Sequence, residues 1–352
     1  MKSSPSILPT ISVIIPHYNG FEQLERCVVS LENTKEVNME IIIVDDCSTD
    51  DSIRLIKFSH PSVKISRTLS NSGYGTACNT GSGVATGEYI IFLNNDTEVD
   101  PYWAFNLMSA MIRHDYLIGT PKILFRENKN IINAEGGSCD RLGMGVNRHN
   151  GLPDYKNINE VETTFYGSAC LAIKASLFAS LKGFDESYYM YNEDVDLCWR
   201  ARLLGYKTLY VSSSIVYHSW MGTTKTAYFS LSYQLRNSLT TIMKNYSLPT
   251  LIYAVPASVL LMFGEALYFS FYSRKMSKNI LNAIRWNFIN IRQTLIKRPT
   301  IQNTRVVSDK VIKGEMETFS FSFKVFLKSH KTPILPRILA IKSEKLEEIS
   351  LK

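Results

Sequence analysis

The chain has 352 residues, of which 45% are hydrophobic and 20% charged, and its net charge is +7. This composition excludes an intrinsically disordered chain, and the length suffices for one large core or two smaller ones. The opening residues hold a short β-branched run that ends in Pro16, so we expect a first strand there and no export signal. Six scattered cysteines without a CxxC pair favour reduced thiols in a cytosolic protein over a disulfide or zinc framework.

Short apolar runs alternate with helix-compatible segments in the first half of the chain. The expected strands are 11–15, 40–44 and 88–93, and the helices that follow them are 20–32, 48–58 and 102–113. Continuous apolar strands between helices predict an α/β fold, with a Rossmann-like and mostly parallel sheet flanked by helices. Because ligands bind such sheets at the carboxyl ends of the strands, we expect the functional site there.

Polar residues gather where these three strands end. In chain order they are Pro16, His17, Tyr18 and Asn19, then Asp45 and Asp46, and then Asn94, Asn95 and Asp96. Three strand ends that converge on one crevice favour a ligand site. For the acids at any single strand end, a purely structural role is an equal alternative: they can form a turn before a helix whose N-cap is, for example, Ser48 or Asp50.

The acidic residues in these motifs suit a nucleotide-diphosphate ligand. Asp45 and Asp46, in IIIVDDCSTD, can accept hydrogen bonds from a pyrimidine imide or from ribose hydroxyls. Asp96, in FLNNDTEVD, offers a hard oxygen ligand for Mg²⁺ or Mn²⁺, with diphosphate and water completing the shell. Such a cation neutralises the charge that develops on a diphosphate leaving group. His218, after a later β-rich run, can add a ligand, although a structural histidine is the commoner alternative.

A glycine-rich segment lies between the second and third of these strand ends. It has neither the GK[ST] phosphate loop nor GxGxxG spacing, so we reject a dinucleotide fingerprint. We expect Asn71, Gly73 and Asn79 instead to shape the loop and helix beside the nucleotide.

Glu193 and Asp194 begin an expected helix that ends near Gly205. They are our candidates for the general base of a sugar transfer in one displacement, which inverts the anomeric centre. Acids in a first helical turn also complement the helix dipole without any catalytic role. Arg236 and Asn237 either hold phosphate or lie on an exposed helix face.

Together these phrases resemble the family 2 glycosyltransferases, especially the bacterial rhamnosyltransferase-like branch. The resemblance covers about residues 10–240 and includes SVIIPHYNG, IIIVDDCSTDDS, FLNNDTEV and KGFDESYYMYNEDVDLCWRARLLGY. It implies a GT-A fold, an inverting mechanism and a divalent cation, Mg²⁺ or Mn²⁺. Asn94 replaces the first acid of the family's DxD motif, which leaves fewer charges on the cation.

The resemblance also implies residue roles. Asp194 falls at the catalytic base with Glu193 beside it, and Asp96 falls at the metal and diphosphate ligand, which we expect His218 to assist. The residues that we expect to bind the nucleotide sugar are Pro16, Tyr18, Asn19, Asp45, Asp46, Asn71, Gly73, Asn94 and Asn95.

We divide the chain into a nucleotide-sugar-binding half (1–120), an acceptor-binding and catalytic half (121–222) and a helical, apolar and basic C-terminal region (223–352). Residues 273–352 contain 17 Lys and Arg against 6 Asp and Glu, whereas the preceding residues contain 22 against 26. The basic tail indicates an anionic partner, which we expect to be a membrane surface and not a nucleic acid.

The apolar run 251–272 is long enough to cross a bilayer, but Pro256 and Glu265 interrupt it. A full crossing would place the basic residues after it outside, against the positive-inside tendency. We therefore expect a cytoplasmic enzyme that lies peripherally on the inner face of the cell membrane. The alternative is a buried helical pair in a soluble homo-oligomer.

We expect an inverting glycosyltransferase that moves a sugar from dTDP-rhamnose or a UDP-sugar to a glycan or lipid-linked glycan in cell-surface polysaccharide synthesis. A non-catalytic nucleotide-sugar-binding scaffold subunit is one alternative, disfavoured because it has no need of both acidic sites. A nucleotidyltransferase is another. It is disfavoured because IIPHYNGFEQ lacks a glycine-rich loop with Lys or Arg for a triphosphate.

Overall fold

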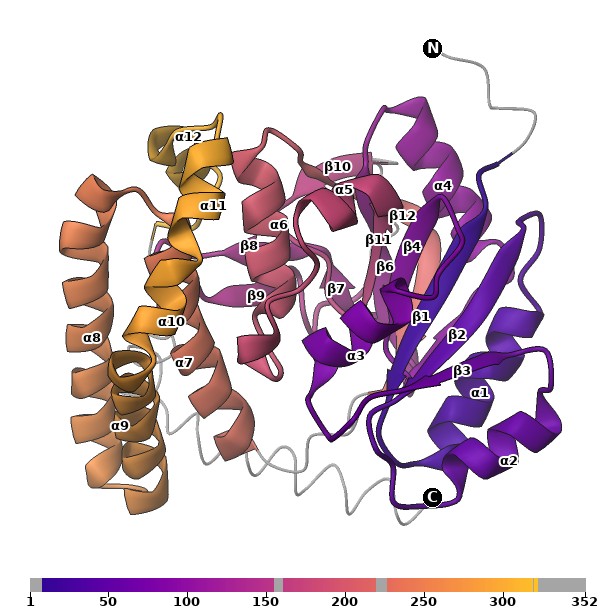
Figure 1. Ribbon diagram of the computed structural model, residues 1–352, viewed down its shortest axis with the longest axis horizontal. Helices are drawn as coiled ribbons and strands as arrows, with labels where there is room; N and C mark the ends of the chain where they lie inside the picture. The colour runs from indigo at the N-terminus through magenta and orange to yellow at the C-terminus, as the bar shows by residue number, and fades with distance from the viewer. Residues whose placement is uncertain (1–7, 155–160, 220–226, 319, 322–352) are drawn as a thin grey trace.

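The computed structural model describes residues 8–154, 161–219, 227–318 and 320–321 (Figure 1). The strands are β1 Ile11–His17, β2 Met39–Asp45, β3 Lys64–Arg67, β4 Tyr89–Leu93, β5 Thr97–Val99, β6 Ile118–Phe125, β7 Asn128–Glu135, β8 Gly137–Cys139, β9 Gly145–Asn147, β10 Val161–Thr164, β11 Cys170–Lys174 and β12 Thr208–His218. The helices are α1 Phe21–Glu32, α2 Ser52–Ser59, α3 Tyr74–Ser82, α4 Trp103–Arg113, α5 Ala175–Ser180, η1 Glu186–Tyr188, α6 Glu193–Leu203, α7 Ala227–Asn245, α8 Leu248–Ser270, α9 Arg274–Ile289, α10 Ile291–Ile296, α11 Arg298–Thr304 and α12 Asp309–Gly314.

The central sheet has the strand order β10-β12-β6-β11-β4-β1-β2-β3. β1 pairs in parallel with both β2 and β4, β2 pairs in parallel with β3, and β12 pairs in parallel with β6. β11 runs antiparallel between β4 and β6, and β10 runs antiparallel to β12. The prediction of a mostly parallel sheet is confirmed. Both predicted halves of the catalytic region contribute strands to it.

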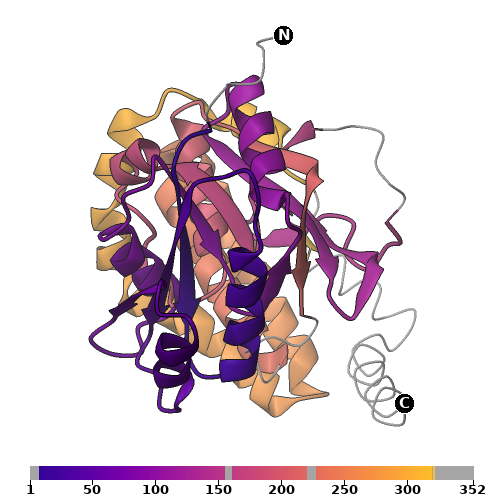
Figure 2. The ribbon, with the colours of Figure 1, turned by 90° about the vertical axis from the view of Figure 1, so that its right-hand side faces the viewer.

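Helices cover both faces of this sheet, which explains why its first strands read as unbroken apolar runs. Side chains of a strand alternate between faces, so Val13 and Ile15 join a core with α1 and α4, whereas Ile14 joins the core on the opposite side. Figure 2 shows the C-terminal helices behind the sheet when the molecule is viewed from the α1 and α2 side.

The predicted helix 48–58 begins later than expected, at Ser52. The residues before it form a loop because Asp45 accepts a hydrogen bond from the Ser48 N–H at 2.7 Å and Asp50 accepts one from the Gly20 N–H at 2.7 Å. The Asp45 bond holds the loop at the end of β2, and the Asp50 bond attaches it to the segment that follows β1. The sequence between β2 and α2 therefore serves the strand end and does not extend the helix.

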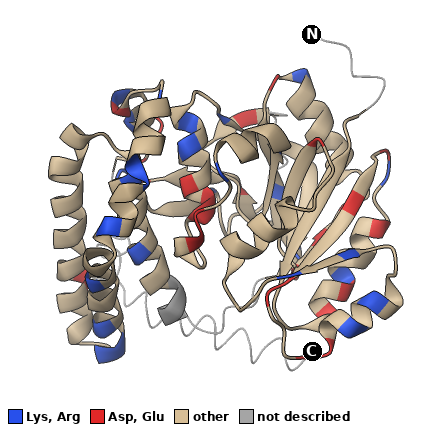
Figure 3. Cartoon of the chain, in the orientation of Figure 1, with Lys and Arg blue, Asp and Glu red and all other residues tan. Residues whose placement is uncertain are grey.

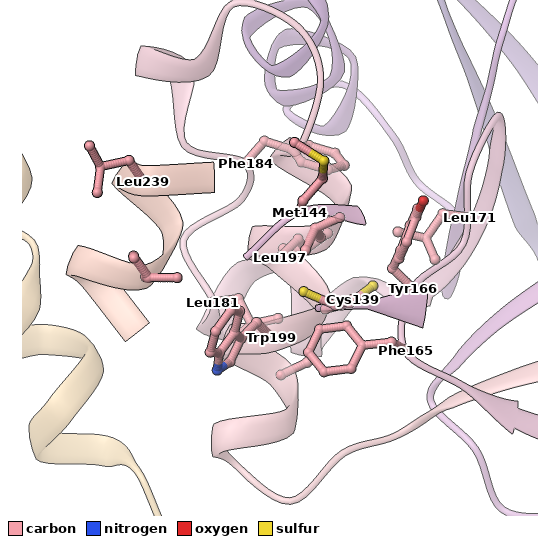
Figure 4. Packing of buried hydrophobic residues seen from close by; sticks show 14 of the residues in the cluster. Cys139, Met144, Phe165, Tyr166, Leu171, Leu181, Phe184, Leu197, Trp199 and Leu239 are labelled. Carbon is pink, nitrogen blue, oxygen red and sulfur yellow. The ribbon is translucent and has the colours of Figure 1, made fainter. Parts of the chain in front are cut away.

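The C-terminal region is helical, as predicted, and packs on the catalytic region through a shared core. Trp199 of α6 contacts Tyr246 after α7 with ring centroids 4.8 Å apart, and Phe165 at 5.8 Å. Figure 4 shows Trp199 and Leu239 of α7 in the same cluster. Helix α6 is consequently enclosed by the sheet on one side and by C-terminal helices on the other.

Candidate active site

A cavity of about 990 Å³ lies at the carboxyl ends of the sheet strands. Eleven residues predicted for the site line it: Pro16, Tyr18, Asp46, Asn71, Gly73, Asn94, Asn95, Asp96, Glu193, Asp194 and His218. A volume of this size accommodates a small organic ligand with its polar groups. The fold thus brings together residues that lie up to two hundred positions apart in the chain.

Asn19 and Asp45 are not among the residues that line the cavity. Asn19 has a φ of 56°, and its side-chain oxygen accepts a hydrogen bond from the Thr49 N–H at 2.8 Å. Asp45 accepts from Ser48, and its other oxygen lies 3.3 Å from the Arg67 guanidinium. In this structure both side chains fasten the loop after β2 and do not face the ligand space.

Asp46 organises the loop that precedes α3. Its carboxylate accepts hydrogen bonds from the Thr68 hydroxyl at 2.7 Å, the Ser72 N–H at 2.9 Å and the Gly73 N–H at 2.8 Å. Gly73 has a φ of +87°, and a Cβ atom there would lie 2.1 Å from the Tyr189 carbonyl oxygen. Only glycine fits this position, where the loop meets the opposite wall of the cavity.

His17 orients the turn after β4, a role that the sequence did not indicate. Its Nδ1 accepts a hydrogen bond from the Asn95 amide at 2.9 Å, which places the proton on Nε2 for donation to the Ser52 hydroxyl at 2.8 Å. Burial lowers the pKa of His17 to about 4, so the ring is neutral at physiological pH. The buried ring therefore fixes the position of Asn95 without adding charge.

Asp96 and His218 meet across a strand pairing. β5 runs antiparallel to β12 and places Thr97 opposite His218, so Asp96 Oδ1 lies 3.1 Å from His218 Nε2. Asp96 is buried and both residues line the cavity. Within the described residues no group of three or more His, Cys, Asp or Glu could hold a metal ion.

This pair fits part of a divalent cation site. One carboxylate oxygen and one imidazole nitrogen are ligands that Mn²⁺ accepts, while Mg²⁺ prefers oxygen. Two protein ligands leave most of the coordination shell open, which suits a cation that is bound together with diphosphate oxygens and water. With so few protein ligands, we expect cation binding at this pair to depend on the donor diphosphate.

Glu193 and Asp194 form the first turn of α6 and both line the cavity. Burial raises the pKa of each carboxyl above its usual range, and the nearby Asp194 raises that of Glu193 further. Asp194 Oδ1 accepts a hydrogen bond from the Val195 N–H at 2.7 Å, which leaves its other oxygen for a ligand. Raised carboxyl pKa values in a cavity are typical of general acids and bases.

The segment that carries these acids has an unusual backbone. Tyr189, Tyr191 and Asn192 all have positive φ values, of 64°, 66° and 70°. Non-glycine residues adopt this conformation at an energetic cost, and only where surrounding contacts enforce it. We call residues 188–192 the strained segment, and its contacts explain how the acids are positioned.

Helix α7 holds the strained segment. The Asn237 amide nitrogen donates to the carbonyl oxygens of Tyr188, Met190 and Tyr191 at 3.1, 2.9 and 2.7 Å. The Arg236 guanidinium donates to the Tyr188 carbonyl and stacks on the Tyr233 and Trp286 rings. For Arg236 and Asn237 we expected either phosphate binding or an exposed helix face. The structure shows neither, because both side chains bind protein backbone.

A buried ion-pair network connects α6 to the same helix. The Lys244 ammonium lies 2.5 Å from Asp185 and 2.9 Å from Asp196, and Arg200 lies 2.8 Å from Asp196. Although burial alone would raise it, the two cations lower the pKa of Asp196, so the carboxylate is ionised. The Asp196–Arg200 spacing of four residues is visible in the sequence, but nothing there signals the contact with Lys244, which lies 48 residues after Asp196.

Solved structures share this fold. The chain superposes on GalNAc-T7, solved with UDP, GalNAc and Mn²⁺, with a TM-score of 0.53 and 21% identity, over 69% of this chain and 53% of that one. It also superposes on the mannosyltransferase PcManGT from Pyrobaculum calidifontis, solved with GDP-Man and Mn²⁺, with a TM-score of 0.51 and 13% identity, over 86% and 88%. The fold is therefore the GT-A fold.

Part of the chain is similar in sequence to a known family. Residues 12–179 match the family model described as Glycosyl transferase family 2. N-acetylglucosaminyl-diphospho-decaprenol L-rhamnosyltransferase of Mycobacterium tuberculosis is 28% identical over 236 residues, 60% of this chain and 76% of its own. The uncharacterized glycosyltransferase YibD of Escherichia coli is 37% identical over 108 residues, and the alignment spans only 31% of its length and 30% of this chain. Residues 12–179, a little under half of the chain, are thus similar to family 2 glycosyltransferases.

Proposed function

We propose that this protein is an inverting glycosyltransferase that moves a sugar from a nucleotide-diphosphate donor to a hydroxyl of a glycan or lipid-linked glycan. One observation carries the proposal. The Asp96–His218 pair and the Glu193–Asp194 pair lie in different parts of the chain but face a single cavity. One-step transfer needs a cation site at the leaving group and a carboxylate at the acceptor.

In the proposed step, the acceptor oxygen attacks the anomeric carbon of the donor sugar from the face opposite the diphosphate. The Asp194 carboxylate takes the acceptor's proton as the new carbon–oxygen bond forms. The bond to the diphosphate breaks, and the leaving group keeps that electron pair. A cation held by Asp96 and His218 would neutralise the departing diphosphate. A single displacement inverts the anomeric configuration.

The raised carboxyl pKa values support Asp194 as the base. A base whose pKa lies closer to the operating pH takes up a hydroxyl proton more effectively than an ordinary carboxylate. Its greater exposure in the cavity favours it over Glu193, which is more deeply buried. We assign Glu193 to a supporting role, in which its proximity raises the basicity of the site.

Several tyrosines suit a sugar ligand. Tyr18, Tyr166, Tyr189 and Tyr191 line the cavity, and their rings offer apolar faces with polar edges. We propose dTDP-rhamnose or a UDP-sugar as the donor, in a pathway of cell-surface polysaccharide synthesis. The similarity to the N-acetylglucosaminyl-diphospho-decaprenol L-rhamnosyltransferase of M. tuberculosis supports this choice.

The test combines donor choice, metal dependence and stereochemistry. The purified full-length protein is incubated with a panel of nucleotide sugars, with Mn²⁺, Mg²⁺ or chelator, and the release of nucleoside diphosphate is measured. We expect one donor class to be hydrolysed or transferred only with a divalent cation, and the product to have the inverted configuration by NMR. Retained configuration would exclude the one-step mechanism. Binding without turnover for every donor would favour a scaffold subunit.

A further inference from the structure

The outward face of α8 carries a continuous apolar stripe. Its large exposed side chains recur at helical spacing and are between 50% and 78% exposed. They are Leu248, Ile252, Leu260, Phe263, Leu267 and Phe271. The one charged residue of α8, Glu265, is buried on the other face. A contiguous exposed apolar face of this length, about 34 Å at 1.5 Å per residue, indicates an interaction surface.

The opposite face of α8 is part of the protein core. Ala254, Met262, Ala266 and Phe269 are buried against the C-terminal helices. Among the described residues α8 is the one helix long and apolar enough to cross a membrane, with a mean hydropathy of 1.7, and a third of that stretch is buried. Insertion across a bilayer would remove these side chains from the core, so the packing favours a helix that stays attached to the protein.

A basic face lies beside the apolar stripe. Arg274, Lys275, Lys278 and Arg285 of α9 are all exposed. The sequence 266–308 contains eight Lys or Arg and no Asp or Glu. Figure 3 shows α8 almost entirely uncharged at the edge of the molecule, with basic patches on α9 next to it. We call the apolar stripe of α8 and these basic residues the α8–α9 face.

We propose that the α8–α9 face docks on an anionic lipid bilayer, with α8 lying in the plane of the membrane. A bilayer provides both partners that the face requires, since its acyl chains accept the apolar stripe and its headgroups pair with the basic residues. A second copy of the chain fits less well. In a twofold dimer through this face, basic side chains would meet basic side chains.

Docking in this way has a consequence for the cavity. The turn between α8 and α9 lies toward the same end of the molecule as the carboxyl end of β1, the lower end in Figure 1. With α8 in the plane of the membrane, the cavity at the strand ends would therefore lie toward the α8–α9 end of the docked helix. The docking does not depend on which sugar is transferred or on whether transfer occurs.

The first test measures binding to vesicles with full-length protein. We expect the protein to float with vesicles of phosphatidylcholine that contain about one third phosphatidylglycerol, and to float less with phosphatidylcholine alone or in high salt. Leu260→Glu and Leu267→Glu should each weaken binding by about tenfold or more, because each places a charge in the acyl region. The matched control is Phe58→Glu on α2, where an exposed aromatic lies outside the face.

The second test separates charge from apolar contact. Reversal of two charges in Lys275→Glu/Lys278→Glu should weaken binding to the anionic vesicles by about fivefold or more and leave binding to neutral vesicles unchanged. Lys57→Glu on α2 is the control. Wild-type protein that stays free of anionic vesicles would overturn the proposal. So would concentration-dependent dimerisation that Leu260→Glu abolishes, because the face would then join two copies of the chain.

Discussion

The two walls of the cavity are built in different ways. The donor wall, formed by the ends of β1, β2 and β4, is held by bonds within the first hundred residues, such as those of Asp46 to the loop before α3. The base wall, formed by the strained segment and the start of α6, depends on α7, more than forty residues further along the chain. Local motifs thus determine one wall, and tertiary packing determines the other.

The two walls also differ in what holds their backbone in place. The donor wall uses short turns at strand ends, where the backbone follows directly from the strand. The base wall keeps three non-glycine residues at positive φ, and the energy that this costs must be offset by contacts from another part of the protein. A helical C-terminal region is therefore a structural component of the base wall as well as a candidate membrane contact.

The largest effect should follow from removing the base. Asp194→Asn keeps the shape of the side chain but cannot accept the acceptor's proton, so kcat should fall by about 10²–10⁴-fold. Binding of the nucleoside diphosphate, measured by calorimetry, should be unchanged because the donor wall is intact. Asp115→Asn is the control, since Asp115 is exposed at a φ of 59°, a conformation that Asn tolerates.

If the Asp194→Asn variant retains turnover, the general base would instead be Glu193. That outcome can be checked directly, because Glu193→Gln should then cause the larger loss. If the base assignment is right, Glu193→Gln should reduce kcat less than Asp194→Asn does, by lowering the basicity of its neighbour.

Much of the donor wall could be predicted from the sequence. The strands, the polar residues at their ends and the Asp96 position all follow from local pattern, and most of these residues line the cavity. Asn19 and Asp45 show the limit of such reasoning. Both stand in motif positions at strand ends, but the direction of their side chains depends on partners in the neighbouring loop, Thr49 and Ser48.

The supports of the base wall could not be predicted in this way. Asn237 and Lys244 sit on a helix whose pattern is compatible with an ordinary surface or core, and their partners are backbone carbonyls and acids some fifty residues earlier. A hydrogen bond to a backbone carbonyl does not require any particular residue type in the partner segment, so the sequence of that segment does not reveal it. Only the three-dimensional contact reveals that these side chains serve the site.

A substitution in α7 should separate the two walls. Asn237→Ala leaves carbonyls of the strained segment unpaired, so unfolding free energy should drop by about 1–3 kcal/mol. Because the start of α6 would shift, kcat should also fall, by about 10²-fold, while nucleotide affinity stays nearly constant. The control is Asn282→Ala on the exposed face of α9. An equal loss of kcat and nucleotide affinity would contradict the separation of the walls.

Loss of a cation ligand should change the metal requirement of the reaction and leave the stability of the fold nearly unchanged. His218→Ala removes one of the two protein ligands, so the Mn²⁺ concentration for half-maximal activity should rise by about 10–100-fold at saturating donor. Titrations of activity with metal measure this shift, and thermal stability should change little. The exposed His114 provides the control in His114→Ala. An unchanged metal requirement would show that the imidazole serves Asp96 through its hydrogen bond alone.

The smallest effect concerns stability and tests the buried state of the base itself. Burial holds the pKa of Asp194 above its value in the unfolded chain. The folded protein therefore binds the proton more tightly, and ionisation destabilises it as pH rises from the unfolded pKa through the folded one. Asp194→Asn, which cannot ionise, should be more stable than wild type above that window by about 1 kcal/mol. Urea unfolding over a pH series measures the gain, which should vanish near pH 4 and below. A gain in the free energy of unfolding that is equal at all pH values would instead reflect altered packing. In that case the ionisation of Asp194 would not destabilise the folded protein.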